Sequence, residues 1–436
     1  MSITNKLCLG VGEAVITQKV GGNLFGYNPH TLSTSVHDDL TASVFLFRTD
    51  NTGAMLVSLT LCEMKTEVND ELRRIASDIS GVPVSNIMIC CTHTHSGPNV
   101  AGYTGWGDID REYIDEILLP RFAEAVTQAA AAVRPVTFGI GRGESLIGIN
   151  RREILPDGTA HLGQNPWGSF DPYMTVLSFK YEDGSSAANI IHYACHGTCA
   201  GNNHEISRDF SGIMCDRVKA LFGGVTAFIN GAEGDVGPRL TNDKTTGFGD
   251  IRYAEEHGGF AAADAVRVRR SIRAYADAEL DAGTYTVWLP MKKRLPLDEA
   301  KALAEKYAGQ TVNLEGQYAK YAQDVIESYE NGYEEIKTRQ MPQTIIRIGD
   351  VVLAGFPFEM FSEIALRVSK YARVPYVLSV SLCNGVNGYF VTEDAICRGG
   401  YEIGMYTTSS IQPFADNADT AYVNETVKNT ETIYHK

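Results

Sequence analysis

Two histidines stand two positions apart where an apolar run gives way to "SGP", in the stretch "CCTHTHSGP". His93 and His95 follow residues 86–91, which are typical of a buried strand. Residues two apart on a strand project to the same side, so both imidazoles could face one pocket. The pattern fits either a metal-ligand pair or two hydrogen-bonded histidines at the end of a core strand. A metal site needs further ligands from elsewhere in the chain.

A third histidine stands in a similar place. His196 follows the apolar run 188–195 and is itself followed by glycine and other small residues that leave room for a ligand. His192 lies inside that run and is expected in the core, and His204 lies in a polar loop. Histidines at strand ends suit a divalent ion such as zinc, which binds imidazole nitrogens together with carboxylate oxygens.

The segment "NGAEGDVGP" marks another strand end. Its glycines let backbone N–H groups come close to a bound group. Gly234, Asp235 and Gly237 are therefore predicted to contact substrate, with a simple tight turn as the alternative. Arg151, in "INRREIL", could orient a substrate carbonyl or carboxylate, with a surface ion pair as the alternative.

Composition narrows the class of protein. The 436 residues carry a net charge of −15 and are 44% hydrophobic, enough for a sizeable core. The acidic balance and the lack of a Lys/Arg cluster argue against nucleic acid and anionic membranes as partners. Nine scattered cysteines indicate a reduced, cytoplasmic chain. We expect no signal peptide and no transmembrane segment, and we leave a homo-oligomer open.

Strand-like and helix-like segments alternate along the chain, which predicts an α/β fold of the mixed α+β layered kind. Central β-sheets would carry flanking helices, with the catalytic site at the C-terminal ends of strands. Hairpins are expected at 43–61 and 343–356, and a long helix at 110–133 with a kink or break at Pro120. Another helix is expected to open at Glu359.

One domain, 1–436, is expected, with a helical insertion at about 296–338. The insertion places aromatic and apolar side chains on one helix face: Tyr318, Tyr321, Val325 and Tyr329. A peripheral helical pair packed on the body is the favoured interpretation. A lid over the site and a dimer contact are the alternatives.

Taken in order, several motifs resemble one known family. They are "GVGEAVIT…GGNLFGY", "THTHSGP", "INR", "CHGT", "NGAEGDVGP", "FPFEMFSEIA" and "NGYFVT…GGYEI". Together they resemble the catalytic domain of the neutral/alkaline, non-lysosomal ceramidases, from about residue 8 to about residue 408. Members of that family are zinc-dependent amidases of sphingolipid metabolism that cleave the N-acyl bond of ceramide.

The resemblance implies one zinc ion per chain and zinc-activated water as the attacking group. The implied zinc ligands are His93, His196, Glu359 and Tyr389. The implied catalytic residues are His95, Arg151 and Tyr401, with His95 as the group for proton transfer. Tyr389 and Tyr401 are expected in glycine-rich loops.

Three departures from the family bear on the substrate. Gly237 stands where the family has a serine, which excludes a serine nucleophile at that position. We also expect no C-terminal immunoglobulin-like domain and no secretion signal. These departures predict a small-molecule amide or ester substrate that is smaller or more polar than ceramide, and they leave a lipid-derived amide open.

Two other classes of function remain open. Cys91, Cys195 and Cys199 lie beside the histidines, so a cysteine-dependent hydrolase is one alternative. A non-catalytic zinc- or ligand-binding member of the family is the other.

Overall fold

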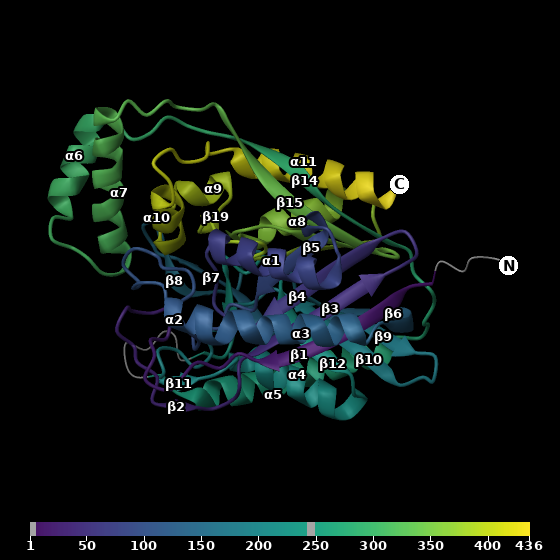
Figure 1. Ribbon diagram of the computed structural model, residues 1–436. Helices are drawn as coiled ribbons and strands as arrows, with labels where there is room; N and C mark the ends of the chain where they lie inside the picture. Colours follow the sequence, from purple (N-terminus) through teal and green to yellow (C-terminus); the bar gives the residue numbers. More distant parts are fainter. Residues whose placement is uncertain (1–5, 242–248) are drawn as a thin grey trace.

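A computed structural model describes residues 6–241 and 249–436 (Figure 1). Its larger sheet has eight strands in the order β12-β10-β9-β6-β1-β3-β4-β5. Their bounds, in chain order, are β1 Cys8–Val15, β3 Thr41–Arg48, β4 Gly53–Leu59, β5 Ile87–Cys91, β6 Arg134–Glu144, β9 Tyr173–Tyr181, β10 Ser186–Tyr193 and β12 Val225–Asn230. The pairs β4–β5 and β10–β12 at the two edges are parallel, and the inner pairs are antiparallel.

A smaller sheet of four strands packs against one face of the larger one. It consists of β14 (Leu280–Pro290), β15 (Thr338–Ile348), β16 (Val351–Gly355) and β18 (Tyr376–Val380). One hydrophobic cluster joins the two sheets, because Phe45 and Leu56 of the larger sheet lie in it together with Leu353 and Leu378 of the smaller one. All four side chains are buried, so the sheets form a sandwich with an apolar interior.

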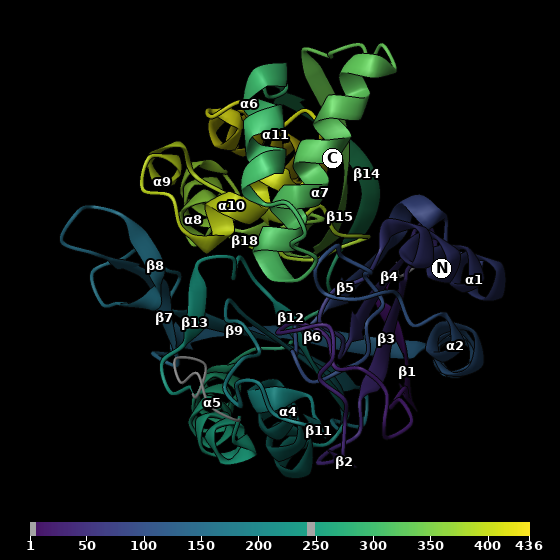
Figure 2. The same cartoon turned by 90° about the vertical axis from the view of Figure 1, so that its left-hand side faces the viewer.

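Helices cover both outer faces of this sandwich (Figures 1 and 2). The larger sheet carries α1 (Thr66–Ser80), α3 (Leu119–Ala131), α4 (Asp209–Phe222) and α5 (Ile251–Ser271). The smaller sheet carries α8 (Ser362–Tyr371) and α11 (Ala418–Tyr434). The order helices–sheet–sheet–helices confirms the predicted layered mixture of α and β structure. Within the described residues, no helix is both long and apolar enough to cross a bilayer.

The other elements complete the described part of the chain. They are β2 Ser35–Val36, η1 Val84–Asn86, α2 Arg111–Tyr113, η2 Ile114–Leu118, β7 Gly148–Ile154, β8 Ala160–Asn165, β11 Glu205–Ile206, β13 Val236–Pro238, α6 Leu297–Lys306, α7 Asn313–Glu330, β17 Glu359–Met360, β19 Tyr389–Phe390, α9 Glu393–Ile396 and α10 Tyr401–Thr408. Strands β7, β8 and β13 form a small three-stranded sheet, and β17 pairs with β19.

Both predicted hairpins are confirmed, as β3–β4 and β15–β16. The predicted helix 110–133 needs correction, because the irregularity is a π-helical turn, η2, that precedes Pro120. Pro120 itself is the second residue of α3, directly after this π-helical turn. The helix expected to open at Glu359 begins instead at Ser362, and Glu359 lies in the short strand β17.

The predicted insertion is helical over α6 and α7, which form a pair beside the body of the molecule (Figure 1). Tyr321 and Val325 are buried against Ala300 of α6, whereas Tyr329 is partly exposed. Tyr318 stacks on Tyr307, with ring centroids 5.0 Å apart. The apolar stripe therefore joins the two helices to each other.

Candidate functional site

Side chains from both sheets meet at the carboxyl ends of their strands. His93 follows β5, at one edge of the larger sheet, and His196 follows β10, the second strand from the opposite edge. Glu359 follows β16 of the smaller sheet. Strands β17 and β19 pair in parallel with Glu359 opposite Tyr389, which brings the tyrosine to the same place. The fold thus gathers residues separated by nearly 300 positions.

Backbone carbonyls orient the two histidines. The Nδ1 atom of His93 lies 3.0 Å from the carbonyl oxygen of Cys62, and the Nδ1 atom of His196 lies 2.8 Å from that of Glu233. A hydrogen bond from Nδ1–H to a carbonyl leaves Nε2 as the free lone pair of each ring. Both Nε2 atoms point at the same carboxylate oxygen, Oε2 of Glu359, at 3.2 Å from His93 and 3.0 Å from His196.

The path to this geometry differs from the predicted strand alternation. Strand β5 ends at Cys91, and His93 has a left-handed backbone with φ 67°. An isolated parallel bridge joins Thr94 to Gly197, and a Cβ on Gly197 would lie only 2.6 Å from the carbonyl oxygen of His93. The two histidine loops therefore lock together through close backbone contact. A turn, and not a shared strand face, aims His93 and His95 into one site.

His95 lies at the edge of the cluster. Its Nε2 is 3.3 Å from Nε2 of His93, and its ring meets that of Tyr27 edge-on at 5.0 Å. Burial, together with the charges of neighbouring groups, holds the pKa of His95 well below its usual value. Gly26 makes room for the ring, because a Cβ there would lie 2.3 Å from Nδ1 of His95.

A buried charged network supports the other side of the site. Arg151 donates through Nη2 to the Tyr389 hydroxyl at 2.8 Å and through Nε to Glu402 at 3.0 Å. Arg152 donates to the second oxygen of Glu402 at 2.7 Å. Tyr401 is the first residue of α10, not a loop residue as predicted, and its ring lies 5.9 Å from that of Tyr389. Glu402 escaped the sequence analysis, since its only signal was its place beside Tyr401.

The donor set fits a tetrahedral cation such as zinc. Ligands bound at about 2.0–2.1 Å in a tetrahedron lie about 3.3 Å from one another. Here Oε2 of Glu359 is 3.0 and 3.2 Å from the two histidine nitrogens, and the Tyr389 hydroxyl is 3.4 Å from Nε2 of His196. Burial raises the pKa of Glu359, but the facing histidines outweigh it and hold that pKa well below its usual value. The carboxylate is thus ready to bind a cation.

A small cavity of about 30 Å³ opens beside these groups. Its lining combines the cluster with aromatic and apolar side chains, including Phe25, Tyr103 and Trp106. Glu63 lines it as well, and burial raises the pKa of this carboxyl to about 8. Glu63 and Tyr103 were missed by sequence reasoning, because nothing in their local sequence distinguishes them from ordinary core residues.

The predicted substrate residues after β12 have other contacts. Asp235 accepts hydrogen bonds from Ser362 N at 2.7 Å and from Asn150 Nδ2 at 3.1 Å, so its carboxylate is engaged within the protein. Gly234 donates its N–H to Met360 O. The α-carbon of Gly237 faces the side chain of Arg151, since a Cβ there would lie 3.5 Å from Cβ of Arg151.

His192, Cys91 and Cys195 lie outside this ligand set. His192 binds the carbonyl oxygen of Ser379 at 2.8 Å, as a core histidine would. Cys91 and Cys195 are buried, and burial raises the pKa of both thiols well above the usual value. A nucleophilic cysteine needs the opposite shift, so Cys91 and Cys195 are disfavoured as nucleophiles.

Comparison with known proteins gives one consistent answer. Neutral ceramidase B of Dictyostelium discoideum is 29% identical over 239 residues, which are 50% of this chain and 33% of that protein. The neutral ceramidase of Mycobacterium tuberculosis is 29% identical over 54% of this chain and 40% of its own length. The match therefore spans well under two thirds of these curated relatives. No family model matches the chain.

The fold comparison covers more of the chain. A crystal structure of neutral ceramidase from Pseudomonas aeruginosa superposes with a TM-score of 0.73, covering 98% of this chain and 75% of that one at 20% identity. At this identity the likeness establishes the fold. Together with the curated relatives, it confirms the resemblance that the motifs indicated.

Proposed function

This chain is related to the neutral ceramidases in sequence and in fold, and from that relationship we propose that it is a zinc-dependent hydrolase of an amide (N-acyl) bond. One observation carries the proposal: Nε2 of His93, Nε2 of His196 and a Glu359 oxygen lie within 4.8 Å of one another in a buried site. Such a set has the composition of catalytic zinc centres, which combine imidazoles with a carboxylate.

His93, His196, Glu359 and Tyr389 would hold the ion, one per chain. When bound, zinc supplies Lewis-acid polarisation of the scissile carbonyl and lowers the pKa of a bound water to about 7. The carbonyls of Cys62 and Glu233 fix the two imidazoles before any ion arrives, which preorganises the site.

The surrounding side chains supply proton transfer and charge stabilisation. The depressed pKa of His95 keeps its imidazole neutral near pH 7, so it can accept a proton and return it to the leaving nitrogen. Burial raises the pKa of Tyr401, which keeps its hydroxyl protonated and able to donate to an oxyanion. Arg151 adds a fixed positive charge, oriented by Glu402.

We further propose that residues 1–436 act as one catalytic unit, because the ligand set draws on both sheets. The substrate would be smaller or more polar than ceramide, in keeping with the departures of this chain from the ceramidase motifs, such as Gly237 in place of the family serine. With Gly237 facing Arg151, no side-chain nucleophile stands at that position.

Metal analysis tests the proposal directly. Purified wild type is expected to contain about one zinc per chain by plasma mass spectrometry, and His196→Ala and Glu359→Ala are each expected to lose it. An amide and ester screen on the zinc-loaded wild type should then find turnover that His95→Ala abolishes without loss of zinc. A wild type that takes up no zinc would refute the proposal. Zinc without turnover would favour a non-catalytic binding protein.

A further inference from the structure

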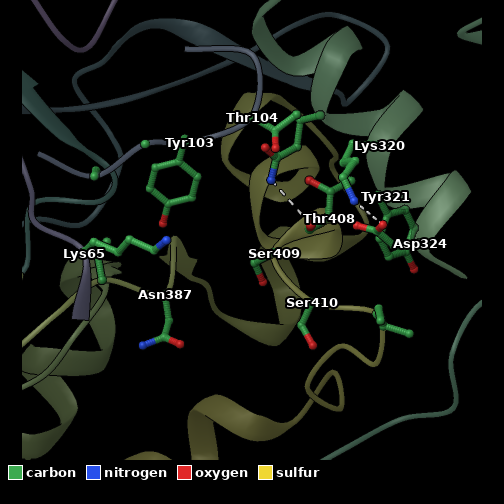
Figure 3. A pocket seen from close by; sticks show the side chains of 15 residues that line it. Lys65, Tyr103, Thr104, Lys320, Tyr321, Asp324, Asn387, Thr408, Ser409 and Ser410 are labelled. Atoms are coloured by element: carbon green, nitrogen blue, oxygen red, sulfur yellow. Dashed lines mark hydrogen bonds and ion pairs between the residues drawn. The ribbon is translucent and has the colours of Figure 1, made fainter. Parts of the chain in front are cut away.

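A second, larger cavity of about 410 Å³ (Figure 3) shares a lining residue with the small cavity of the candidate site. It is bounded by α7 of the helical pair, by the loop that carries Tyr103 and Thr104, by Lys65 and by the C-terminal end of α10. Tyr103 lines both this cavity and the small one at the metal-ligand cluster. The two spaces are therefore neighbours, with one aromatic side chain between them.

The lining of the larger cavity is polar and includes an ammonium without a partner. Lys65 makes no ion pair or side-chain hydrogen bond with residues 6–241 or 249–436. On the opposite wall, Lys320 of α7 pairs with Asp324 (Figure 3). The two lysines and one aspartate leave the cavity with one excess positive charge, in a protein whose net charge is −15.

A buried acceptor adds a second feature of a built site. Gln317 of α7 is only 7% exposed, and its Nε2 donates to the carbonyl oxygen of Thr408 at 3.4 Å. Its Oε1 has no hydrogen-bond partner among the described residues, although Gln317 lines the cavity. Burying an acceptor without a partner is costly, and because this oxygen is itself shielded from solvent, a donor supplied by a ligand would restore the hydrogen bond once the Gln317 side chain turns toward the cavity.

We propose that this cavity, the Lys65 pocket, binds a polar arm of the substrate that ends in a carboxylate, with Lys65 as its counter-ion. The inference rests on the proposed function, since it places the scissile amide at the metal-ligand cluster and the anion beyond Tyr103. The phenol ring of Tyr103 separates the two cavities and is several bonds long. The carboxylate of the substrate must therefore lie several atoms away from the scissile amide. An alkyl chain in the Lys65 pocket would shield its polar lining groups from water without offering them hydrogen bonds. The helical pair α6–α7 then bounds the cavity that determines substrate specificity.

Matched amides test the charge and its position. One pair carries the anion on the amine side, N-octanoyl-6-aminohexanoate against N-octanoyl-6-aminohexanol. The other carries it on the acyl side, the mono-octylamide of adipic acid against that of 6-hydroxyhexanoic acid. In one of the two pairs, wild type should hydrolyse the amide that carries a carboxylate with a kcat/KM at least about tenfold higher than that of its neutral partner, mainly through a lower KM.

Lys65→Met should reduce that preference to about threefold or less and leave the kcat/KM of the neutral amide unchanged. Lys301→Met is the matched control, because Lys301 is an exposed lysine of α6 outside the cavity lining. Absence of a carboxylate preference in both pairs, or a preference that Lys65→Met leaves intact, would overturn the inference while the proposed function stands.

If none of the four amides is turned over, the proposed function fails for them. Binding measured by calorimetry then tests the Lys65 pocket independently of turnover. Binding of either carboxylate amide to wild type, weakened about tenfold by Lys65→Met but not by Lys301→Met, supports it. Failure of both carboxylates to bind, or equal affinity in the two variants, overturns it.

Discussion

Replacing Glu402 with glutamine should expose the cost of the buried network behind the site. Glu402 is 1% exposed and shares its two oxygens between Arg151 and Arg152. Glutamine keeps one acceptor but removes the negative charge and turns an NH₂ group toward a guanidinium. The two buried arginines then lack a carboxylate to balance their charge. Removing one partner of a buried ion pair costs about 3–5 kcal/mol of folding stability.

The chain length converts this free energy into a melting shift. An unfolding entropy of about 2.1 cal/mol/K per residue gives about 0.9 kcal/mol/K for 436 residues. The Tm of Glu402→Gln should therefore fall by about 3–5 °C. Arg151 also loses one of the two contacts that orient it, so we expect kcat to fall about tenfold or more with a smaller change in KM.

Scanning calorimetry on wild type and variant measures the first effect, and steady-state kinetics on a substrate from the amide screen measures the second. Glu330→Gln is the control, because Glu330 is exposed at the end of α7 and forms no ion pair with the described residues. A Glu402→Gln protein that melts within about 1 °C of this control would refute the reasoning. It would mean that water or a local shift neutralises the arginines at little cost.

Three further predictions concern the groups around the cluster. Gly26→Ala places a Cβ where the His95 ring now lies, at a backbone φ of +126°, so turnover should fall at least about tenfold while zinc content by plasma mass spectrometry stays at wild-type level; zinc loss would contradict this. Burial raises the pKa of Asp235 to about 7, so its contribution to stability is complete below about pH 4 and is lost as pH rises to 7. Denaturant titrations should show wild type losing stability relative to Asp235→Asn between about pH 4 and pH 7, and parallel pH profiles would contradict that shift. Removing zinc with a chelator should lower Tm by about 4 °C for a site loaded at about 1,000 times its Kd, with recovery on adding zinc but not magnesium; an unchanged Tm would argue against a folded-state zinc site.

Local pattern was enough to predict the layers and both hairpins, because strand alternation and turn residues lie within a few positions of one another. It was also enough to place His93 and His196 at strand ends. The route of the chain between strands was harder to predict. The helix expected at Glu359 lost its first turn to β17, since pairing with Tyr389 is a contact across 30 residues that no local signal reports.

Most residues that support the metal-ligand cluster could not be predicted from the sequence for the same reason. Glu402 faces Arg151 from about 250 positions away, and Glu63 becomes unusual only through burial beside the cluster. The left-handed backbone of His93 is set by the close approach of Gly197, a tertiary contact between two loops. Residue types therefore indicated which groups could do chemistry, while their orientation came from contacts distant in sequence.

The two-sheet sandwich has a consequence for dissecting the molecule. His93 and His196 belong to the part of the chain before the connection 272–279, and Glu359 and Tyr389 belong to the part after it. A cut in that connection would leave two of the four ligands on each fragment. A cation bound by all four side chains would therefore hold the two fragments together. Its binding free energy would then add to their association, and reassembly of the split protein would depend on the concentration of the metal.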